Sequence, residues 1–277
     1  MFGLLLVTLA TFLEESSDSF GKFEIRKKEE SIFGMGFLSI IMGFLFLCVS
    51  LFFGQKFSFS SASLPTFCVR IILEILQLHI GLIAIVKADR STYSFLRVIT
   101  IPLLVMVDVF LMGYALKTSQ LLGVLIIVIT MVVSGYKNVL NKNGIWLALF
   151  TAVNAVFTIS LYKYDISNFN SVVAEQGIIT IVLLAYLMAF AHIRREINPF
   201  KLLLVPKFFL QSSSVGVGSL METFAYMYAP ASIIATGKRA TAMLWSTLAG
   251  WKYFGEKNLL HKLVVCCFLV IGVFLLL

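Results

Sequence analysis

The sequence predicts an all-α membrane protein in which ten transmembrane helices form two inverted five-helix repeats. Of its 277 residues, 60% are hydrophobic and only 13% are charged, and the mean hydropathy is +0.97. This is more apolar side chain than a soluble core of this size can bury. Nearly charge-free segments recur along the chain, each close to the roughly 20 residues with which a helix crosses about 30 Å of hydrocarbon. A duplicated segment divides the chain into two similar halves.

Ten apolar segments are separated by polar and charged residues, and each predicts one helix. The expected helices span residues 2–22, 31–54, 64–87, 91–114, 117–137, 143–162, 172–192, 202–225, 229–253 and 259–277. The first five form one repeat (1–137) and the last five another (144–277), joined by a linker (138–143). Because each repeat holds an odd number of helices, we expect the copies to have opposite orientations in the membrane.

The duplication is clearest in residues 3–25 and 144–166, which match at a displacement of 141 positions. Each copy begins with a glycine and an apolar stretch. Each ends with a lysine, an aromatic residue, an acid and an isoleucine, at positions 22–25 and 163–166. Duplicated helix bundles in membrane proteins often place a substrate site between the repeats, near the middle of the bilayer.

The first expected helix has an apolar start that could also be the core of a signal peptide. It lacks a basic region before the apolar run, and acidic residues follow the run in place of a small-residue cleavage site. Its duplicate at 144–163 lies inside the chain. We therefore expect the first helix to be retained.

Short motifs in the last helices resemble the EamA-type drug/metabolite transporter superfamily. Residues 253–260 (YFGEKNLL), followed by an apolar helix with Gly272, are similar to the family's closing signature. Residues 225–232 (AYMYAPAS) resemble the entry into its ninth helix, and Pro102 matches its usual proline in the fourth. The resemblance covers nearly the whole chain. It implies two inverted five-helix repeats and the export or exchange of small metabolites, and it identifies no substrate.

Three carboxylates, Glu14, Glu15 and Asp18, follow the apolar run of the first helix. A central Asp costs roughly 2.5 to 3.5 kcal/mol on membrane insertion, and neighbouring carboxylates in a low dielectric cannot all ionise cheaply. The spacing from Glu14 to Lys22 resembles that of the small multidrug resistance transporters. This implies proton coupling at Glu14, with Glu15 or Asp18 assisting. In the alternative interpretation the helix ends at Leu13, and the acids lie in a solvated loop.

Cations recur at the same displacement, since Lys22 matches Lys163, and Arg97 matches Lys238. We interpret Lys22 and Lys163 as anchors that snorkel at helix ends. Arg97, Lys238 and the adjacent Arg239 lie inside predicted helices, where a charge usually faces a partner or a cavity. The Lys238-Arg239 pair resembles a phosphate-binding pair of the sugar-phosphate translocators, and Lys163 lies near a further lysine of that site. The resemblance implies that these cations bind an anionic substrate.

Two further helices carry polar residues at helical spacing. Arg70 and Glu74 are four residues apart, which predicts a structural ion pair along one helix. A polar stripe on the eighth helix is expected to line a water-filled cavity, and it consists of Lys207, Gln211, Ser214, Gly218 and Glu222. We include Gln211, Ser214 and Glu222 among the candidate substrate-binding residues.

The net charge of +8 does not indicate nucleic-acid binding, because excess Lys and Arg in a polytopic protein usually marks cytoplasmic loops. Lys and Arg are concentrated in the odd-numbered loops. This charge bias would put those loops in the cytoplasm and both termini outside, whereas the family resemblance implies the opposite orientation. Both orientations remain open. No Cys/His spacing or glycine loop predicts a metal or cofactor. The expected partners are a small-molecule substrate, protons and the lipid bilayer of the cell membrane, with the chain acting as a monomer or homodimer.

These patterns favour a secondary transporter that works by alternating access, is coupled to protons or to exchange, and carries a carboxylate or phosphate. One alternative is a broad exporter of cationic or neutral compounds, in which the acids bind the substrate. Another is an intramembrane enzyme or assembly factor without transport activity. We do not expect an enzyme, because no metal-ligand set or Ser/Lys nucleophile pair lies at matched depth in two helices.

Overall fold

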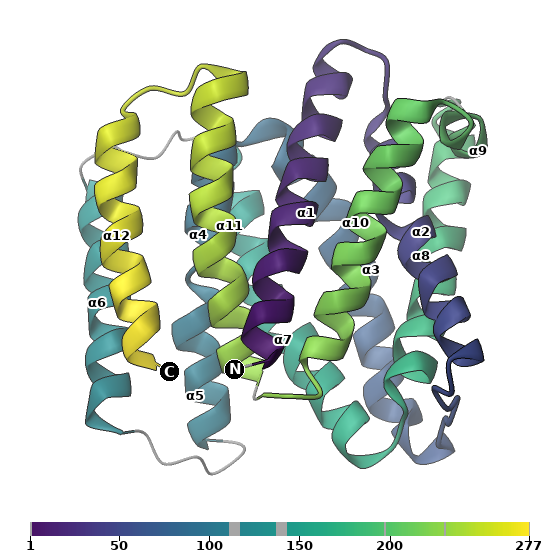
Figure 1. Ribbon diagram of the computed structural model, residues 1–277, viewed down its shortest axis with the longest axis horizontal. Helices are drawn as coiled ribbons and strands as arrows, with labels where there is room; N and C mark the ends of the chain where they lie inside the picture. The colour runs from purple at the N-terminus through teal and green to yellow at the C-terminus, as the bar shows by residue number, and fades with distance from the viewer. Residues whose placement is uncertain (1, 111–116, 137–142, 197, 230, 277) are drawn as a thin grey trace.

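The computed structural model describes residues 2–110, 117–136, 143–196, 198–229 and 231–276. The described residues form helices and connecting turns, and none of them is in a β-strand. The long helices lie side by side, and successive ones run in opposite directions (Figure 1). Both termini lie at the lower end in this view, which we call the terminal end of the bundle. We call the opposite end the far end.

The helices follow the expected order. The first half contains α1 (Phe2–Arg26), α2 (Ile32–Phe52), the 3₁₀ turn η1 (Ser61–Ser63), α3 (Leu64–Lys87), α4 (Arg90–Arg97), α5 (Thr100–Phe110) and α6 (Thr118–Tyr136). The second half contains α7 (Ile145–Asn168), α8 (Val172–Ile193), α9 (Pro199–Leu203), α10 (Pro206–Ala225), α11 (Ala231–Phe254) and α12 (Leu259–Leu276).

Two expected helices are interrupted. The segment predicted as one helix at 91–114 contains α4 and α5, and its residues 111–114 lie outside the described ranges. Pro102 has no N–H to donate to the carbonyl of Val98, so a helical hydrogen bond is missing at the turn between α4 and α5. The segment predicted at 202–225 consists of the end of α9 followed by α10. The expected first and sixth helices both extend further, to Arg26 and Asn168.

Helix starts are specified locally and in the same way in both halves. Ser31 caps α2 by accepting a hydrogen bond from the backbone N–H of Gly34, and Ser171 caps α8 by accepting one from Ala174. A proline lies in the first turn of both α3 and α10, where its missing N–H costs nothing. These prolines, Pro65 and Pro206, are 141 positions apart.

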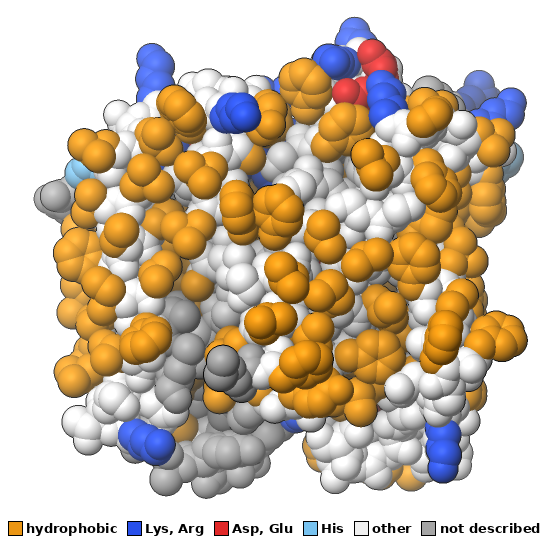
Figure 2. All heavy atoms as spheres, in the orientation of Figure 1, with side chains coloured by type: hydrophobic (Ala, Val, Ile, Leu, Met, Phe, Trp, Pro, Cys, Tyr) orange, Lys and Arg blue, Asp and Glu red, His pale blue; other side chains and the backbone are white. Residues whose placement is uncertain are grey.

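The surface is that of a membrane protein. Five helical segments are long and apolar enough to cross a bilayer: Ile32–Phe52, Ser61–Lys87, Arg90–Val107, Ile145–Asn168 and Val172–Ile193. Apolar side chains spread across the middle of the face shown in Figure 2, while Lys and Arg gather toward its two ends. Large apolar side chains are fully accessible, with Phe52 89% and Trp146 82% exposed. Lipid is the solvent in which such a surface is stable.

Helix packing gives the two halves equivalent neighbours. In the first half, α1 packs against α10 and α11, whereas α7 packs against α3, α4 and α5. Helix α2 packs against α8, and α6 packs against α12. At the 141-residue displacement of the sequence, the contacts of α1 with α10 and α11 correspond to those of α7 with α3, α4 and α5.

Candidate functional site

A cavity of about 190 Å³ lies between the two halves, and its wall is rich in charge. Charged side chains reach it from α3, α4, α10 and α11, and they are Arg70, Glu74, Arg97, Glu222, Lys238 and Arg239. Tyr162 and Tyr226 add aromatic surface. The three cations that the sequence placed inside helices 4 and 9 therefore line one cavity.

Lys238 is held by carboxylates from two other helices. Its Nζ lies 2.7 Å from Glu14 of α1 and also forms an ion pair with Glu222 of α10. All three side chains are largely buried, with exposed fractions of 16 to 21%. The Lys238 charge is thus compensated within the protein, and Glu14 adjoins the cavity through this lysine.

Arg97 and Arg239 form no such ion pair among the described residues. No described carboxylate lies within 4 Å of either guanidinium, and Arg239 is only 3% exposed. Their Nε atoms are buried without a described hydrogen-bond partner, and Arg97 lies over the ring of Tyr93 at 5.3 Å. Because an uncompensated buried charge is costly, two guanidiniums facing one cavity favour the binding of an anion.

The other two acids of the first helix bind a different cation. Arg90, at the start of α4, is completely buried, and its Nη2 donates to Glu15 while its Nη1 lies 3.8 Å from Asp18. Helix α1 continues past all three carboxylates to Arg26. The alternative interpretation, in which the helix ends at Leu13 and a solvated loop follows, is therefore wrong.

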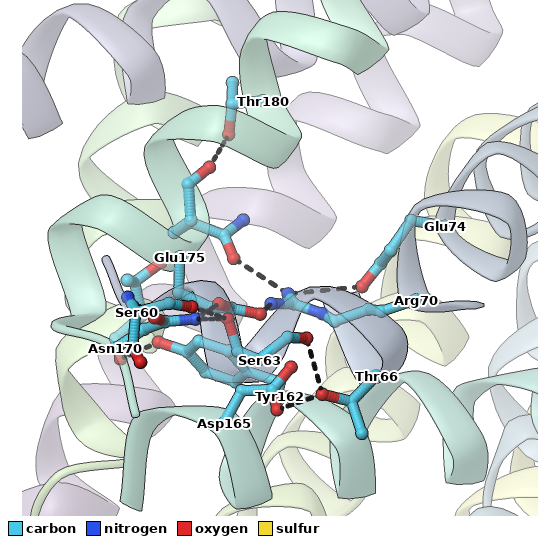
Figure 3. Close-up of polar contacts among 12 residues, drawn as sticks. Ser60, Ser63, Thr66, Arg70, Glu74, Tyr162, Asp165, Asn170, Glu175 and Thr180 are labelled. Carbon is cyan, nitrogen blue, oxygen red and sulfur yellow. Dashed lines mark hydrogen bonds and ion pairs between the residues drawn. The ribbon is translucent and has the colours of Figure 1, made fainter. Parts of the chain in front are cut away.

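A buried polar network surrounds Arg70, which also lines the cavity (Figure 3). The expected pair with Glu74 is present at 3.4 Å, but a shorter ion pair of 2.7 Å joins Arg70 to Glu175 of α8. Arg70 also donates to Gln176 at 3.1 Å and lies 4.5 Å from the ring of Tyr162. Arg70 thus links α3, α7 and α8.

The network continues into the two loops at the terminal end of the bundle. Asn170 donates to Glu175 at 2.6 Å and to Ser63 at 2.9 Å, and it accepts from the backbone N–H of Ser60. The backbone N–H of Ser171 donates to the Ser58 carbonyl at 2.8 Å, and the Ser171 hydroxyl accepts from the backbone N–H of Ser58 at 3.0 Å. The connection before α3 is thereby fixed to the connection between α7 and α8.

Three candidate binding residues lie elsewhere. Lys163 donates to the carbonyl oxygens of Tyr226 at 2.8 Å and Ala229 at 3.4 Å. Gln211 is buried against Gly21 of α1, and Ser214 does not line the cavity. Of the expected polar stripe on α10, Glu222 alone reaches the cavity, because this face of α10 packs against α1.

The interpretation of Lys22 as a snorkelling anchor is wrong. Lys22 is 1% exposed and donates to the carbonyl of Ala88, because α1 continues for another turn beyond it. A lysine so deeply enclosed contributes to the packing of α1 against the start of α4.

Arg90, Glu175 and Glu256 form polar contacts that join helices, and the sequence pattern did not indicate these contacts. Glu256, in the turn after α11, accepts hydrogen bonds from the backbone N–H of Arg90 at 2.7 Å, the hydroxyl of Ser91 and Lys262 at 2.8 Å. Burial acts to raise the pKa of Glu256, but the bonds from Lys262 and Ser91 outweigh it and hold that pKa below its ordinary value. A single acid at an otherwise apolar helix start, as at Glu175, indicates a buried polar contact but does not identify its partner.

No family model matches the sequence, and no curated protein matches it.

Proposed function

We propose that the chain is a secondary transporter of EamA type, with ten membrane-crossing helical segments arranged as two inverted repeats. The equivalent neighbours of α1 and α7 support the repeat, as do the matched prolines that begin α3 and α10. A charged cavity between the halves is where such a transporter binds its substrate. Alternating access then exposes this cavity to each side of the membrane in turn.

The substrate in this proposal is a small organic anion bearing a carboxylate or phosphate. The observation that carries it is the pair of uncompensated guanidiniums, Arg97 and Arg239, facing one cavity. Planar guanidiniums bind carboxylate and phosphate oxygens through paired hydrogen bonds. Lys238 lines the same cavity, where Glu14 and Glu222 hold it and compensate its charge.

Proton coupling is assigned to Glu14 in this proposal. A proton taken up by Glu14 would remove one of the two negative charges that hold Lys238 and so free the lysine for the substrate. Glu15 and Asp18 share Arg90 instead, outside the wall of the cavity. We therefore expect them to orient α4 and give Glu14 the coupling role.

Binding of a cation is the second candidate, because Glu74 and Glu222 line the same cavity. The two candidates predict opposite ligands, so thermal stabilisation of the purified protein by matched organic anions and cations separates them. We expect stabilisation by anions. Stabilisation by cations alone would overturn the anion proposal in favour of a cation exporter.

Arginine variants test the assignment of the site. Arg97→Gln and Arg239→Gln should each weaken anion binding about 10- to 100-fold, as expected for losing a hydrogen bond to a charged group. Arg194→Gln, the same change at an exposed position after α8, serves as the matched control. Equal affinity in all three variants would exclude this cavity as the anion site.

Uptake into proteoliposomes tests transport and coupling. Anion uptake driven by an imposed pH gradient should be lost in Glu14→Gln, while Glu29→Gln, an exposed acid in the α1–α2 loop, should retain it. Counterflow exchange without a gradient reports whether the variant still binds and moves substrate. Gradient-driven uptake that persists in Glu14→Gln would assign coupling to another group.

A further inference from the structure

Two carboxylates occupy equivalent positions in the two halves but have different partners. Glu24 and Asp165 are 141 positions apart, and so are the residues they contact, Lys207 and Thr66. In the first pair the Lys207 ammonium forms an ion pair with Glu24. In the second pair the Thr66 hydroxyl donates to Asp165 Oδ1 at 2.6 Å. In the Asp165 pair, a neutral hydroxyl therefore occupies the position that the lysine ammonium occupies in the Glu24 pair.

Asp165 is enclosed and incompletely hydrogen-bonded. Its exposed fraction is 0%, and its second oxygen, Oδ2, is buried without a donor among the described residues. Hydrogen bonds through Thr66, Ser63 and Asn170 link it to Glu175, and the Glu175 carboxyl group is its charged neighbour. Both groups belong to the polar network around Arg70 (Figure 3).

Each oxygen of Glu175 accepts one hydrogen bond from a neighbouring side chain. Arg70 donates to Oε1 at 2.7 Å and Asn170 donates to Oε2 at 2.6 Å. Donors of this kind stabilise the ionised carboxylate. An ionised Asp165 beside it would place two like charges together in a buried site, which is unfavourable.

The surrounding charges do not compensate for a second carboxylate. The charged groups that act on Asp165 are Arg70 from α3 and Glu175 from α8. Glu74 of α3 shares Arg70, and Tyr162 of α7 lies against the Arg70 guanidinium. This set has one cation for three carboxyl groups. Arg70 already forms ion pairs with both Glu74 and Glu175.

We propose that Asp165 holds a proton on Oδ2 and donates it to Glu175, which makes this pair a proton-binding site beside the cavity. The proton supplies the donor that Oδ2 lacks and removes the like-charge contact. The site is separate from Glu14 and does not depend on the proposed transport function. It also adjoins the cavity, because Arg70 and Tyr162 line the cavity and contact the same network.

Infrared spectroscopy of the purified full-length protein with isotope-labelled aspartate tests the proposal. A protonated carboxylic acid has a carbonyl band that a carboxylate lacks, and labelling distinguishes aspartic acid from glutamic acid. We expect a label-sensitive acid band at pH 7 that is lost in Asp165→Asn. Because Asn resembles a protonated Asp in shape, this variant should unfold at the same temperature as the wild type.

Thr66→Lys provides a second, independent test, because it copies the Glu24–Lys207 pair of the other half. A lysine here should ionise Asp165 and abolish the band, whereas Thr66→Val, which adds no charge, should retain it. A wild-type spectrum without an acid band of Asp165 would overturn the proposal. So would sodium-dependent thermal stabilisation that is lost in Asp165→Asn, since the oxygen would then bind a metal ion.

Discussion

Lys22 and Lys163, which lie 141 positions apart, donate to the backbone carbonyls of Ala88 and Ala229, which are separated by the same 141 positions. Each lysine ties the end of one long helix to the connection before another. An elongated, flexible side chain finds the equivalent carbonyl in each half only if the surrounding backbones have similar shapes. This relationship supports the repeat proposal independently of helix count.

Replacing either lysine by methionine should destabilise the protein. Removing a charged donor from a buried carbonyl costs about 1.5 to 3 kcal/mol, and Lys22→Met should cost more than Lys163→Met because Lys22 is the more enclosed. Lys27→Met, at a side chain that is 48% exposed, is the control. Unfolding in detergent measures the change, and a neutral Lys163→Met would show that the second contact contributes nothing.

The two carboxylates on Lys238 should be partly redundant. Glu14→Gln leaves Glu222 to compensate the lysine, so we expect a loss of about 1 kcal/mol or less from this one change. Changing both acids to glutamine leaves the buried Lys238 ammonium without a carboxylate partner, which should lower the free energy of unfolding by about 3 to 5 kcal/mol. A double-mutant cycle on the free energy of unfolding measures this coupling, and strictly additive losses would contradict the shared ion pair.

Glu256→Gln should loosen the contact between the end of α11 and the start of α4. The change weakens bonds to Arg90, Ser91 and Lys262, and we expect a loss of about 1 to 3 kcal/mol at pH 7. The pKa of Glu256 is lower in the folded protein than its ordinary value. Its stabilising effect is therefore present above the ordinary pKa of about 4.5 and is lost as pH falls through the folded one.

The difference in unfolding temperature between wild type and Glu256→Gln should thus shrink on acidification. Thermal unfolding at pH 7 and near pH 4 measures it. A difference that is the same at both values would show that the glutamine acts through packing and not through charge.

Helix positions could be predicted from the sequence because apolar length, proline and N-terminal serine are local signals. Five of the expected segments are long and apolar enough to span a membrane in the structure. The break between α4 and α5 could also have been anticipated, since Pro102 was already identified and removes one hydrogen bond of the helix. These features depend on neighbours in sequence.

The polar partners could not be predicted, because they depend on how helices pack. The spacing of Arg70 and Glu74 predicted their pair, but no local pattern indicates that Glu175, 105 positions after Arg70, provides the shorter contact. In the same way, Glu14 lies next to Lys238 only because α1 packs between α10 and α11. The positions of the cations could be predicted from the duplicated sequence. Which of these cations lack a carboxylate partner depends on how the helices pack.

Glu30, in the turn between α1 and α2, should make stability decrease with rising pH. Its side chain is buried, and neither carboxyl oxygen has a described hydrogen-bond partner, so burial raises its pKa to about 8. In the unfolded chain Glu30 ionises near 4.5. Between these two values the unfolded state has released the proton and the folded state has kept it, so the folded state loses stability as pH rises.

Glu30→Gln removes this dependence without changing the shape of the side chain. The variant should match the wild type below the ordinary pKa and become progressively more stable than the wild type up to about pH 8, above which the difference is constant. Thermal unfolding in detergent across this range measures the gain. Glu29→Gln is the neighbouring control, because hydrogen bonding to Lys207 lowers the pKa of Glu29 and its removal should act in the opposite direction. A Glu30→Gln variant less stable than the wild type at pH 8 would show that the ionised carboxylate has a favourable partner.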